Sequence, residues 1–114
     1  MGNDTAEKKY IFIVGERATI TCNVTAQDPK LQLLYWKKDN DVMSEEDVVV
    51  PKFKDKYKVT LDRTVPDNVT YSITFIVEKD DVGNYNCTCA SGGIQYPVWV
   101  KGKYHETIRN LQQL

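Results

Sequence analysis

The chain has 114 residues, with 15 Lys and Arg against 16 Asp and Glu, and a formal net charge of -1 at pH 7. This length fits one small domain and argues against a second core. The charge balance excludes a nucleic-acid or anionic-membrane binder that depends on a basic surface. No apolar run is long enough to span a bilayer or to act as a signal peptide, so we expect a mature or excised part of a larger protein.

Short segments in which apolar and polar residues alternate follow one another along the chain and predict β-strands. The expected strands cover residues 10–14, 17–24, 33–37, 48–50, 57–61, 71–77, 85–89 and 96–101. The residues expected to face inward are Ala18, Ile20, Cys22, Val24, Leu34, Trp36, Tyr57, Val59, Leu61, Tyr71, Ile73, Phe75, Val77, Tyr85, Cys87, Cys89, Val98 and Val100. Residues 62–70 have the composition of a turn, and Gly92–Gly93 predicts a flexible tip between the last two strands.

One constellation of residues is more specific than the alternation. Trp36 follows Cys22 by fourteen residues, and a D-x-G-x-Y-x-C run ends at Cys87, 65 residues after Cys22. This arrangement resembles the immunoglobulin superfamily over about residues 10–101. The resemblance implies an all-β, immunoglobulin-like Greek-key sandwich of two sheets with an inter-sheet Cys22–Cys87 disulfide, and Trp36 fills the space beside the bridge.

The same run predicts a tight corner before the strand that carries Cys87. We expect the Tyr85 hydroxyl to bond back to the backbone and Asp81 to pair with a basic side chain, for which Lys56 is the best candidate. Gly83 lies between Asp81 and Tyr85 in the motif. The segment 39–51 predicts a turn and at least one extra strand that ends at Pro51, so the domain resembles an intermediate or variable-like set. Residues 96–99 lack the F-G-x-G bulge of antigen-receptor variable domains.

Four N-glycosylation sequons begin at Asn3, Asn23, Asn68 and Asn86, whereas seven Asn and thirteen Ser or Thr would give roughly 0.8 by chance. A disulfide that closes a loop of this length would stabilise the fold by roughly 4 kcal/mol in an oxidising compartment. Both signals favour an extracellular location. Muscle domains of the same family keep reduced thiols, so a cytosolic reading stays open.

The residues on the outer faces of the two sheets differ in polarity, which predicts different roles for the two faces. The outer face of the sheet formed by strands A (10–14), B (17–24), E (71–77) and D (57–61) carries Thr, Ser, Lys and Arg and should be solvated. The face formed by strands G (96–101), F (85–89), C (33–37) and C′ (48–50) should instead hold one exposed patch that binds a protein. The patch is predicted from Leu33, Tyr35, Lys37, Ile94, Tyr96 and Trp99. The alternative is that the C′ segment or a neighbouring domain covers these side chains, and a glycan at Asn86 would block flat docking.

Cys89 departs from the family pattern. Geometry forbids a bond to Cys87 on the same strand, so we expect either a buried thiol that acts as a small apolar residue or a bond to a cysteine outside this chain. No catalytic set is found around the single histidine, His105, and no spacing fits a metal site. We therefore expect no enzymatic activity, no cofactor and no small-molecule substrate.

The sequence thus predicts an extension over residues 1–9, an immunoglobulin-like domain over 10–102, and a linker, next-domain start or expression tail over 103–114. The expected function is an extracellular recognition or adhesion module that binds another immunoglobulin-type ectodomain or itself. It would contact a membrane only through an anchor or spanning segment outside these residues. The alternative is an intracellular structural domain of a sarcomeric or filament scaffold.

Overall fold

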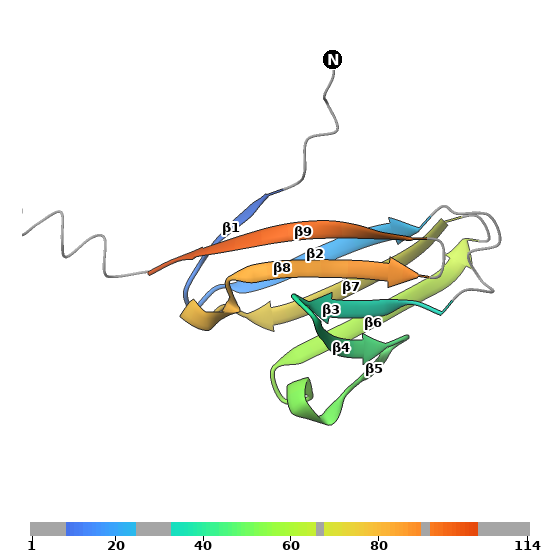
Figure 1. Cartoon of the computed structure of the whole chain (residues 1–114), viewed down its shortest axis with the longest axis horizontal. Helices are drawn as coiled ribbons and strands as arrows, with labels where there is room; N and C mark the ends of the chain where they lie inside the picture. The colour runs from blue at the N-terminus through green and yellow to red at the C-terminus, as the bar shows by residue number, and fades with distance from the viewer. Residues whose placement is uncertain (1–8, 25–32, 66–67, 90–91, 103–114) are drawn as a thin grey trace, which may run out of the picture.

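The structure is a computed structural model that describes residues 9–24, 33–65, 68–89 and 92–102. These residues form nine strands and two short 3-10 helices (Figure 1). The elements are β1 (Tyr10–Ile13), β2 (Arg17–Val24), β3 (Tyr35–Lys38), β4 (Asp41–Glu45), β5 (Val48–Val49), η2 (Pro51–Phe53), β6 (Tyr57–Val65), β7 (Asn68–Ile76), η3 (Lys79–Asp81), β8 (Gly83–Cys89) and β9 (Gly92–Lys101). The expected boundaries at residues 1–9 and 103–114 lie largely outside the described part.

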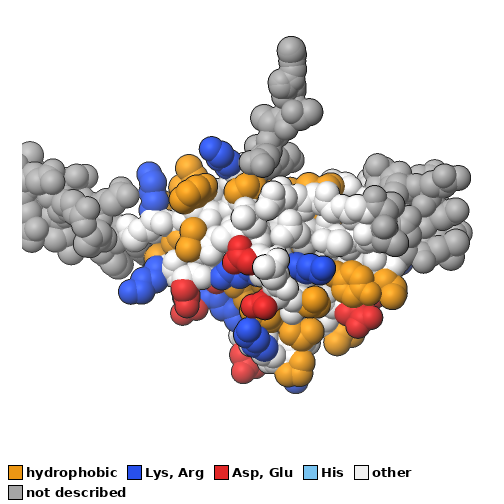
Figure 2. Space-filling model, viewed as in Figure 1, with side chains coloured by type: hydrophobic (Ala, Val, Ile, Leu, Met, Phe, Trp, Pro, Cys, Tyr) orange, Lys and Arg blue, Asp and Glu red, His pale blue; other side chains and the backbone are white. Residues whose placement is uncertain are grey.

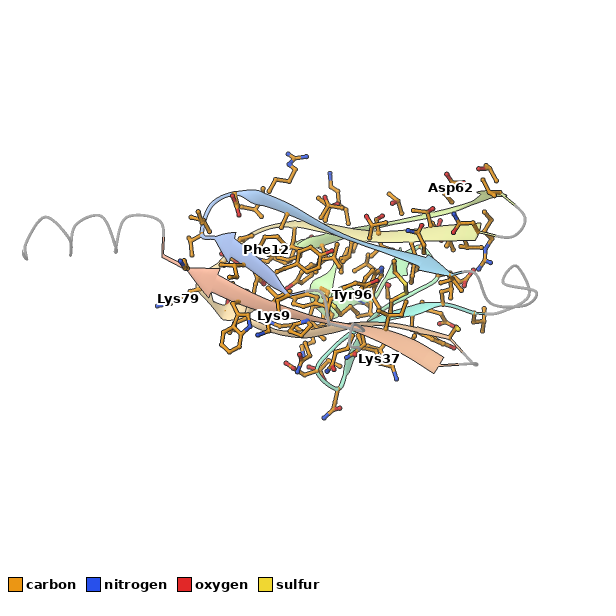
Figure 3. The ribbon with its side chains drawn as sticks, turned by 90° about the horizontal axis from the view of Figure 1, so that it is seen from above. Lys9, Phe12, Lys37, Asp62, Lys79 and Tyr96 are labelled. Carbon is orange, nitrogen blue, oxygen red and sulfur yellow. A yellow bond between two sulfur atoms is a disulfide. The ribbon has the colours of Figure 1, made fainter. Side chains whose placement is uncertain are left out.

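The strands form two sheets that stack face to face. The larger sheet has the order β1-β9-β8-β3-β4-β5, and the smaller sheet has the order β2-β7-β6. Figure 3 shows the two layers edge-on, with Phe12 and Tyr96 between them and Lys37 on the outer side of the larger sheet. The prediction of an all-β two-sheet sandwich is confirmed, as is the Cys22–Cys87 disulfide, which joins β2 to β8 with a Cα–Cα distance of 6.4 Å.

Buried and outward residues alternate along both β2 and β7, and this alternation fixes how the two strands pair. Every second residue of β2 is buried, and its neighbours in between are exposed. The outward positions form hydroxyl pairs across the ladder: Thr19 Oγ1 lies 2.9 Å from Thr74 Oγ1, and Thr21 Oγ1 lies 3.0 Å from Ser72 Oγ. Apolar burial on one side and polar pairs on the other fix the register, because a slip of one residue would exchange the two faces.

The core is built around Trp36, whose side chain is fully buried. Its ring stacks on Tyr71 at a centroid distance of 5.6 Å and lies 6.1 Å from the Tyr96 ring. Most of the residues expected to face inward are buried. Val59, Leu61, Cys89 and Val100 are only partly buried at the margin of the core. Cys89 therefore packs against the core without being enclosed by it, and it is not part of the Cys22–Cys87 bridge.

The first strand belongs to the other sheet from the one predicted. The sequence analysis grouped it with the A-B-E-D sheet, but β1 runs parallel to β9, with Tyr10 opposite Val98 and Ile13 opposite Lys101. The chain changes sheets at Gly15, which has a φ of 97°. Its amide donates to the Val77 carbonyl at 2.8 Å, whereas the preceding Val14 amide still donates to Lys101. A left-handed φ favours glycine, so Gly15 allows the crossing.

Two predicted loops are strands. Residues 62–70 were expected to be a turn, but β6 continues to Val65 and β7 begins at Asn68. The polar residues of this segment occupy outward ladder positions, as in the pair of Asp62 with Thr70. Gly92 and Gly93 were expected at a loop tip, but they begin β9 and pair with Cys89 and Thr88. The extra strand predicted before Pro51 is present as β5, after β4.

Candidate functional site

The candidate site is the outward surface of the larger sheet, which we call the six-strand face. Figure 2 shows that its hydrophobic side chains gather in two separate areas, one over the left part of β1 and β9 and one at the lower right over β3 to β5. Polar and charged side chains lie between them. The sequence predicted one patch, whereas the structure divides the exposed apolar side chains of this face between two areas.

Strand register explains the separation. Tyr35 pairs with Thr88, and Thr88 pairs with Gly93, so Tyr35 is level with Gly93 and lies six residues from Trp99 along β9. At a rise of 3.3 Å per residue, this offset is about 20 Å. Leu33 lies further still from Trp99, because β3 and β9 run in the same direction and Leu33 precedes Tyr35. Leu33 and Tyr35 therefore cannot share a contact surface with Trp99 unless the partner spans most of the sheet.

Two of the predicted binding residues lie on the other side of β9. Tyr96 is only 5% exposed, and its ring lies 6.0 Å from that of Tyr10 inside the sandwich. Ile94 shares the side of β9 that carries Tyr96 and Val98, because it is two and four residues away from them. Its side chain is exposed, yet it pairs with the inward Cys87. Tyr96 and Ile94 are therefore not part of the six-strand face.

The first apolar area is the Trp99 cluster, defined as Ile11, Ile13, Val82 and Trp99. Ile11 pairs with Trp99 across the parallel ladder, and their side chains are 60% and 56% exposed. Val82 precedes Gly83, which is opposite Val98. The sequence analysis missed the two isoleucines, because it placed β1 in the smaller sheet. The alternation of Tyr10 and Phe12 inward with Ile11 and Ile13 outward was the available signal.

The second apolar area is the Tyr35 cluster, defined as Leu33, Tyr35, Val42 and Val48. Glu45 pairs with Tyr35 on one side and with Val48 on the other, which brings β3, β4 and β5 together on this part of the face. Leu33 is 52% exposed and Val48 is 66% exposed, whereas Tyr35 is half-buried. Lys37 pairs with Val42 next to the cluster. The sequence analysis named Leu33, Tyr35 and Lys37 but not the two valines.

A buried hydrogen-bond network fixes the hairpin that carries half of the Tyr35 cluster. The Tyr71 hydroxyl lies 2.9 Å from Ser44 Oγ and shares its single proton between the Glu46 carbonyl at 2.5 Å and the Leu34 carbonyl at 3.2 Å. Glu46 Oε1 accepts from Arg63 of β6 at 2.6 Å. Burial raises the pKa of Tyr71 to about 12, so the hydroxyl stays protonated. The network ties β3, the β4–β5 turn and both sheets together.

The corner before β8 has the contacts that its motif predicts. The Tyr85 hydroxyl donates to the Asp81 carbonyl at 2.8 Å, and Lys56 Nζ lies 2.9 Å from Asp81 Oδ2. Asp81 is buried and also accepts from the Tyr57 hydroxyl at 2.7 Å. Desolvation alone lowers the pKa of Lys56, but hydrogen bonds from its ammonium to Glu78 and Asp81 outweigh this effect and the pKa is raised. The corner is structural: its buried contacts lie inside the sandwich, and Val82 directly after it belongs to the Trp99 cluster.

The sequons fall on both sheets. Asn23 is exposed on the outer face of the smaller sheet, where its Oδ1 accepts from the Thr70 hydroxyl at 3.2 Å. Asn68 lies on the same face, two residues from Thr70. Asn86 pairs with Lys37 and with Gln95 in the middle of the six-strand face. Asn3 lies outside the described residues. A glycan on Asn86 would stand between the two apolar clusters.

Within the described ranges, no group of three or more His, Cys, Asp or Glu side chains could hold a metal ion. None of the helices in the described part is long and apolar enough to cross a bilayer. His105 lies outside the described residues, so its surroundings are not part of this description.

The immunoglobulin domain family model matches residues 9–100. No curated protein matches the sequence significantly. Among solved structures, the RIG-5 IG1 homodimer has a TM-score of 0.69 at 19% identity and covers 87% of this chain and 94% of its own. A structure from a study of multimeric cell-adhesive interactions of voltage-gated sodium channel beta subunits has a TM-score of 0.64 at 15% identity, covering 90% and 99%.

The titin domain I81 has a TM-score of 0.57 at 17% identity and covers 83% of this chain and 90% of its own. These structural likenesses, at low identity, show the fold. The family match covers most of the sequence and includes both bridge cysteines, Trp36 and the corner residues. The chain therefore belongs to the immunoglobulin domain family.

Proposed function

We propose that the chain is an extracellular recognition module that binds another protein, of the immunoglobulin type, through its six-strand face. The observation that carries this proposal is the pair of exposed apolar clusters on that face. Aromatic and large aliphatic side chains exposed together are typical of binding surfaces. The outer face of the smaller sheet instead carries hydroxyl pairs such as Thr19 with Thr74, which suit contact with water.

Two features support an extracellular location. The Cys22–Cys87 disulfide closes a long loop and is typical of proteins that fold in oxidising compartments. Of the sequon asparagines, Asn23 is exposed, and Asn68 and Asn86 are half-buried on outward positions of their strands. Disulfides and N-linked glycans are both typical of the secretory pathway and are rare in the cytosol.

The structural neighbours agree with a role in protein association. One is a homodimer, and another comes from a study of multimeric cell-adhesive interactions. A different function is favoured by other neighbours, a titin domain and a human obscurin-like domain with a TM-score of 0.54. In that alternative the chain is an intracellular structural domain of a filament scaffold and serves as a spacer.

A binding assay with alanine variants tests the proposed face. Tyr35→Ala and Trp99→Ala should each weaken association with the partner, another immunoglobulin-type ectodomain (a sister ectodomain), at least tenfold, which corresponds to about 1.4 kcal/mol. Ile76→Ala is the matched control, because Ile76 is 49% exposed but lies on the smaller sheet. The proposal fails if both face variants bind as the parent does, or if the control loses as much.

Mass spectrometry of the protein from its native source separates the two compartments. The extracellular function predicts hexose-containing glycans on at least one sequon and a Cys22–Cys87 bridge. The scaffold function predicts an unmodified chain whose three cysteines all react with an alkylating reagent before reduction.

A further inference from the structure

The two apolar clusters of the six-strand face differ in the charges around them. Three exposed lysines surround the Trp99 cluster. Lys101 pairs with Ile13, Lys9 directly precedes the first residue of β1, and Lys79 lies on η3, which packs against β9. Asp80 and Glu16 offset part of this positive charge. Figure 2 shows basic side chains on the borders of this area.

The Tyr35 cluster has the opposite character. Glu45 lies between Tyr35 and Val48 in the ladder, and Asp47 is exposed in the turn that follows. Neither carboxylate is needed by the Tyr71 network, which uses Glu46 instead. Lys37 offsets part of the negative charge. One face thus has an apolar cluster with a basic border at one end and an apolar cluster with an acidic border at the other.

We infer that the partner of this face is a second copy of the chain, packed face to face and antiparallel, so that the Trp99 cluster of each copy meets the Tyr35 cluster of the other. This inference rests on the proposed function and names its partner. A two-fold axis makes both contacts at once, because an isologous interface repeats each contact with the roles of the copies exchanged. Pairing the same end with itself would instead bring like charges together.

The geometry of the sheet is compatible with this arrangement. The axis would pass midway between the clusters, near Asn86 and its neighbours Lys37 and Gln95, which are polar and half-buried or exposed. The six strands of this sheet contain 32 residues together, and at about 3.3 Å per residue and about 4.8 Å between strands they offer on the order of 500 Å² per copy. This area is at the low end for specific interfaces, so the dimer should be weak, with a micromolar dissociation constant.

Charge reversal at the two ends tests the inference with the full 114-residue chain made without glycans. Sedimentation velocity measures self-association of the parent, of the double variant Lys9→Glu with Lys101→Glu, and of the double variant Glu45→Lys with Asp47→Lys. Each variant alone should associate at least tenfold more weakly than the parent, because both contacts then become repulsive. All four side chains are exposed, so circular dichroism should show an unchanged fold.

An equimolar mixture of the two variants is the decisive measurement. In the mixed dimer, the reversed end of each variant meets the reversed end of the other, and the two unaltered ends also meet. Association should therefore return to within about threefold of the parent. A parent that is monomeric at millimolar concentration overturns the inference, and so does a mixture that stays as weak as its components.

The same set of proteins separates this inference from the proposed function. If the parent is monomeric but binds a sister ectodomain, and Tyr35→Ala and Trp99→Ala abolish that binding, the face is a recognition site for a different protein. If neither self-association nor ectodomain binding depends on this face, both are wrong.

Discussion

Leu34 and Glu46 are hydrogen-bonded to each other twice. The Glu46 amide donates to the Leu34 carbonyl at 2.7 Å, and the Leu34 amide donates to Glu46 Oε2 at 2.7 Å. Glu46 makes these contacts with a φ of 56°, a left-handed conformation that costs an L-residue roughly 1 kcal/mol. The Glu46 carboxylate accepts hydrogen bonds from the Leu34 amide and from Arg63, and these contacts offset the backbone cost.

Replacing Glu46 by Ala and by Gly separates the contribution of its side-chain contacts from the cost of its positive φ. Both variants lose the carboxylate contacts to Leu34 and Arg63, which should destabilise the protein by about 1–3 kcal/mol. Only Ala keeps the backbone cost, so Glu46→Ala should be about 1 kcal/mol less stable than Glu46→Gly. Urea unfolding measures both values. Equal stabilities of the two variants would show that the positive φ is not maintained in solution.

The buried corner predicts a large effect at Asp81 and a small one at its neighbour. Asp81→Asn removes the buried carboxylate that pairs with Lys56, which keeps its contact with Glu78, and should cost about 1–3 kcal/mol. Asp80→Asn is the matched control. Asp80 is exposed, and Lys38 bonds to its backbone carbonyl, which the substitution keeps. The control should stay within about 0.5 kcal/mol of the parent in chemical denaturation.

The tyrosines and Lys56 predict a loss of stability at alkaline pH. Burial raises the pKa values of Tyr57, Tyr71 and Tyr85. The pKa of Lys56 is raised as well. Each group is protonated in the folded state at a pH where the unfolded chain has lost the proton. The stabilisation is therefore complete below about pH 10 and falls as the pH rises further.

Absorbance at 295 nm across this pH range checks the prediction. The chain has seven tyrosines, and the buried ones should ionise only together with unfolding, which circular dichroism follows in parallel. Ionisation of all seven near pH 10 with the fold intact would contradict the burial described above.

The disulfide should account for a substantial part of the stability. A closed loop of 65 residues predicts a loss of about 4 kcal/mol when Cys22 and Cys87 are both replaced by Ala, with some further loss from the missing sulfur atoms. Cys89→Ser is the control for a cysteine outside the bridge and should cost less. Guanidinium unfolding measures both. A double variant that is as stable as the parent would exclude a structural role for the bridge.

A glycan on Asn86 should inhibit contacts at the six-strand face. In protein secreted from eukaryotic cells, Asn86→Gln should bind at least as well as the parent, whereas Asn23→Gln should have no effect, because Asn23 is on the smaller sheet. Peptide mapping gives the occupancy of each sequon, and surface capture gives the affinity. Full occupancy of Asn86 together with undiminished binding would place the binding surface elsewhere.

The inward residues of the fold were predictable because alternation and the Cys22, Trp36 and Cys87 spacing act on the same strands. Tyr71, Ile73 and Phe75 are buried as the alternation requires. The sheet that a strand joins is a different matter. The residues of β1 alternate in the same way whether it pairs with β2 or β9, and the backbone at Gly15 decides between them.

The binding residues were harder to predict, because the exposure of a side chain depends on which distant segments cover it as well as on which face of the sheet it occupies. Tyr96 follows the same alternation as Val98, yet a tyrosine near a strand end was interpreted as exposed; its burial comes from Tyr10 and Trp36, which belong to distant segments. The Glu46 network was not predictable, since nothing in the sequence brings Arg63 of β6 to the β4–β5 turn.

Gly15 is exposed and belongs to neither apolar cluster, yet its backbone conformation bears on one of them. At this residue the chain passes from β1, which pairs with β9 in the larger sheet, to β2 in the smaller sheet, and β1 is the strand that places Ile11 alongside Trp99. A side chain at residue 15 would oppose that transfer while leaving the bridge, the Trp36 core and the Tyr35 cluster in place. A substitution at Gly15 therefore acts on the Trp99 cluster more than on the Tyr35 cluster.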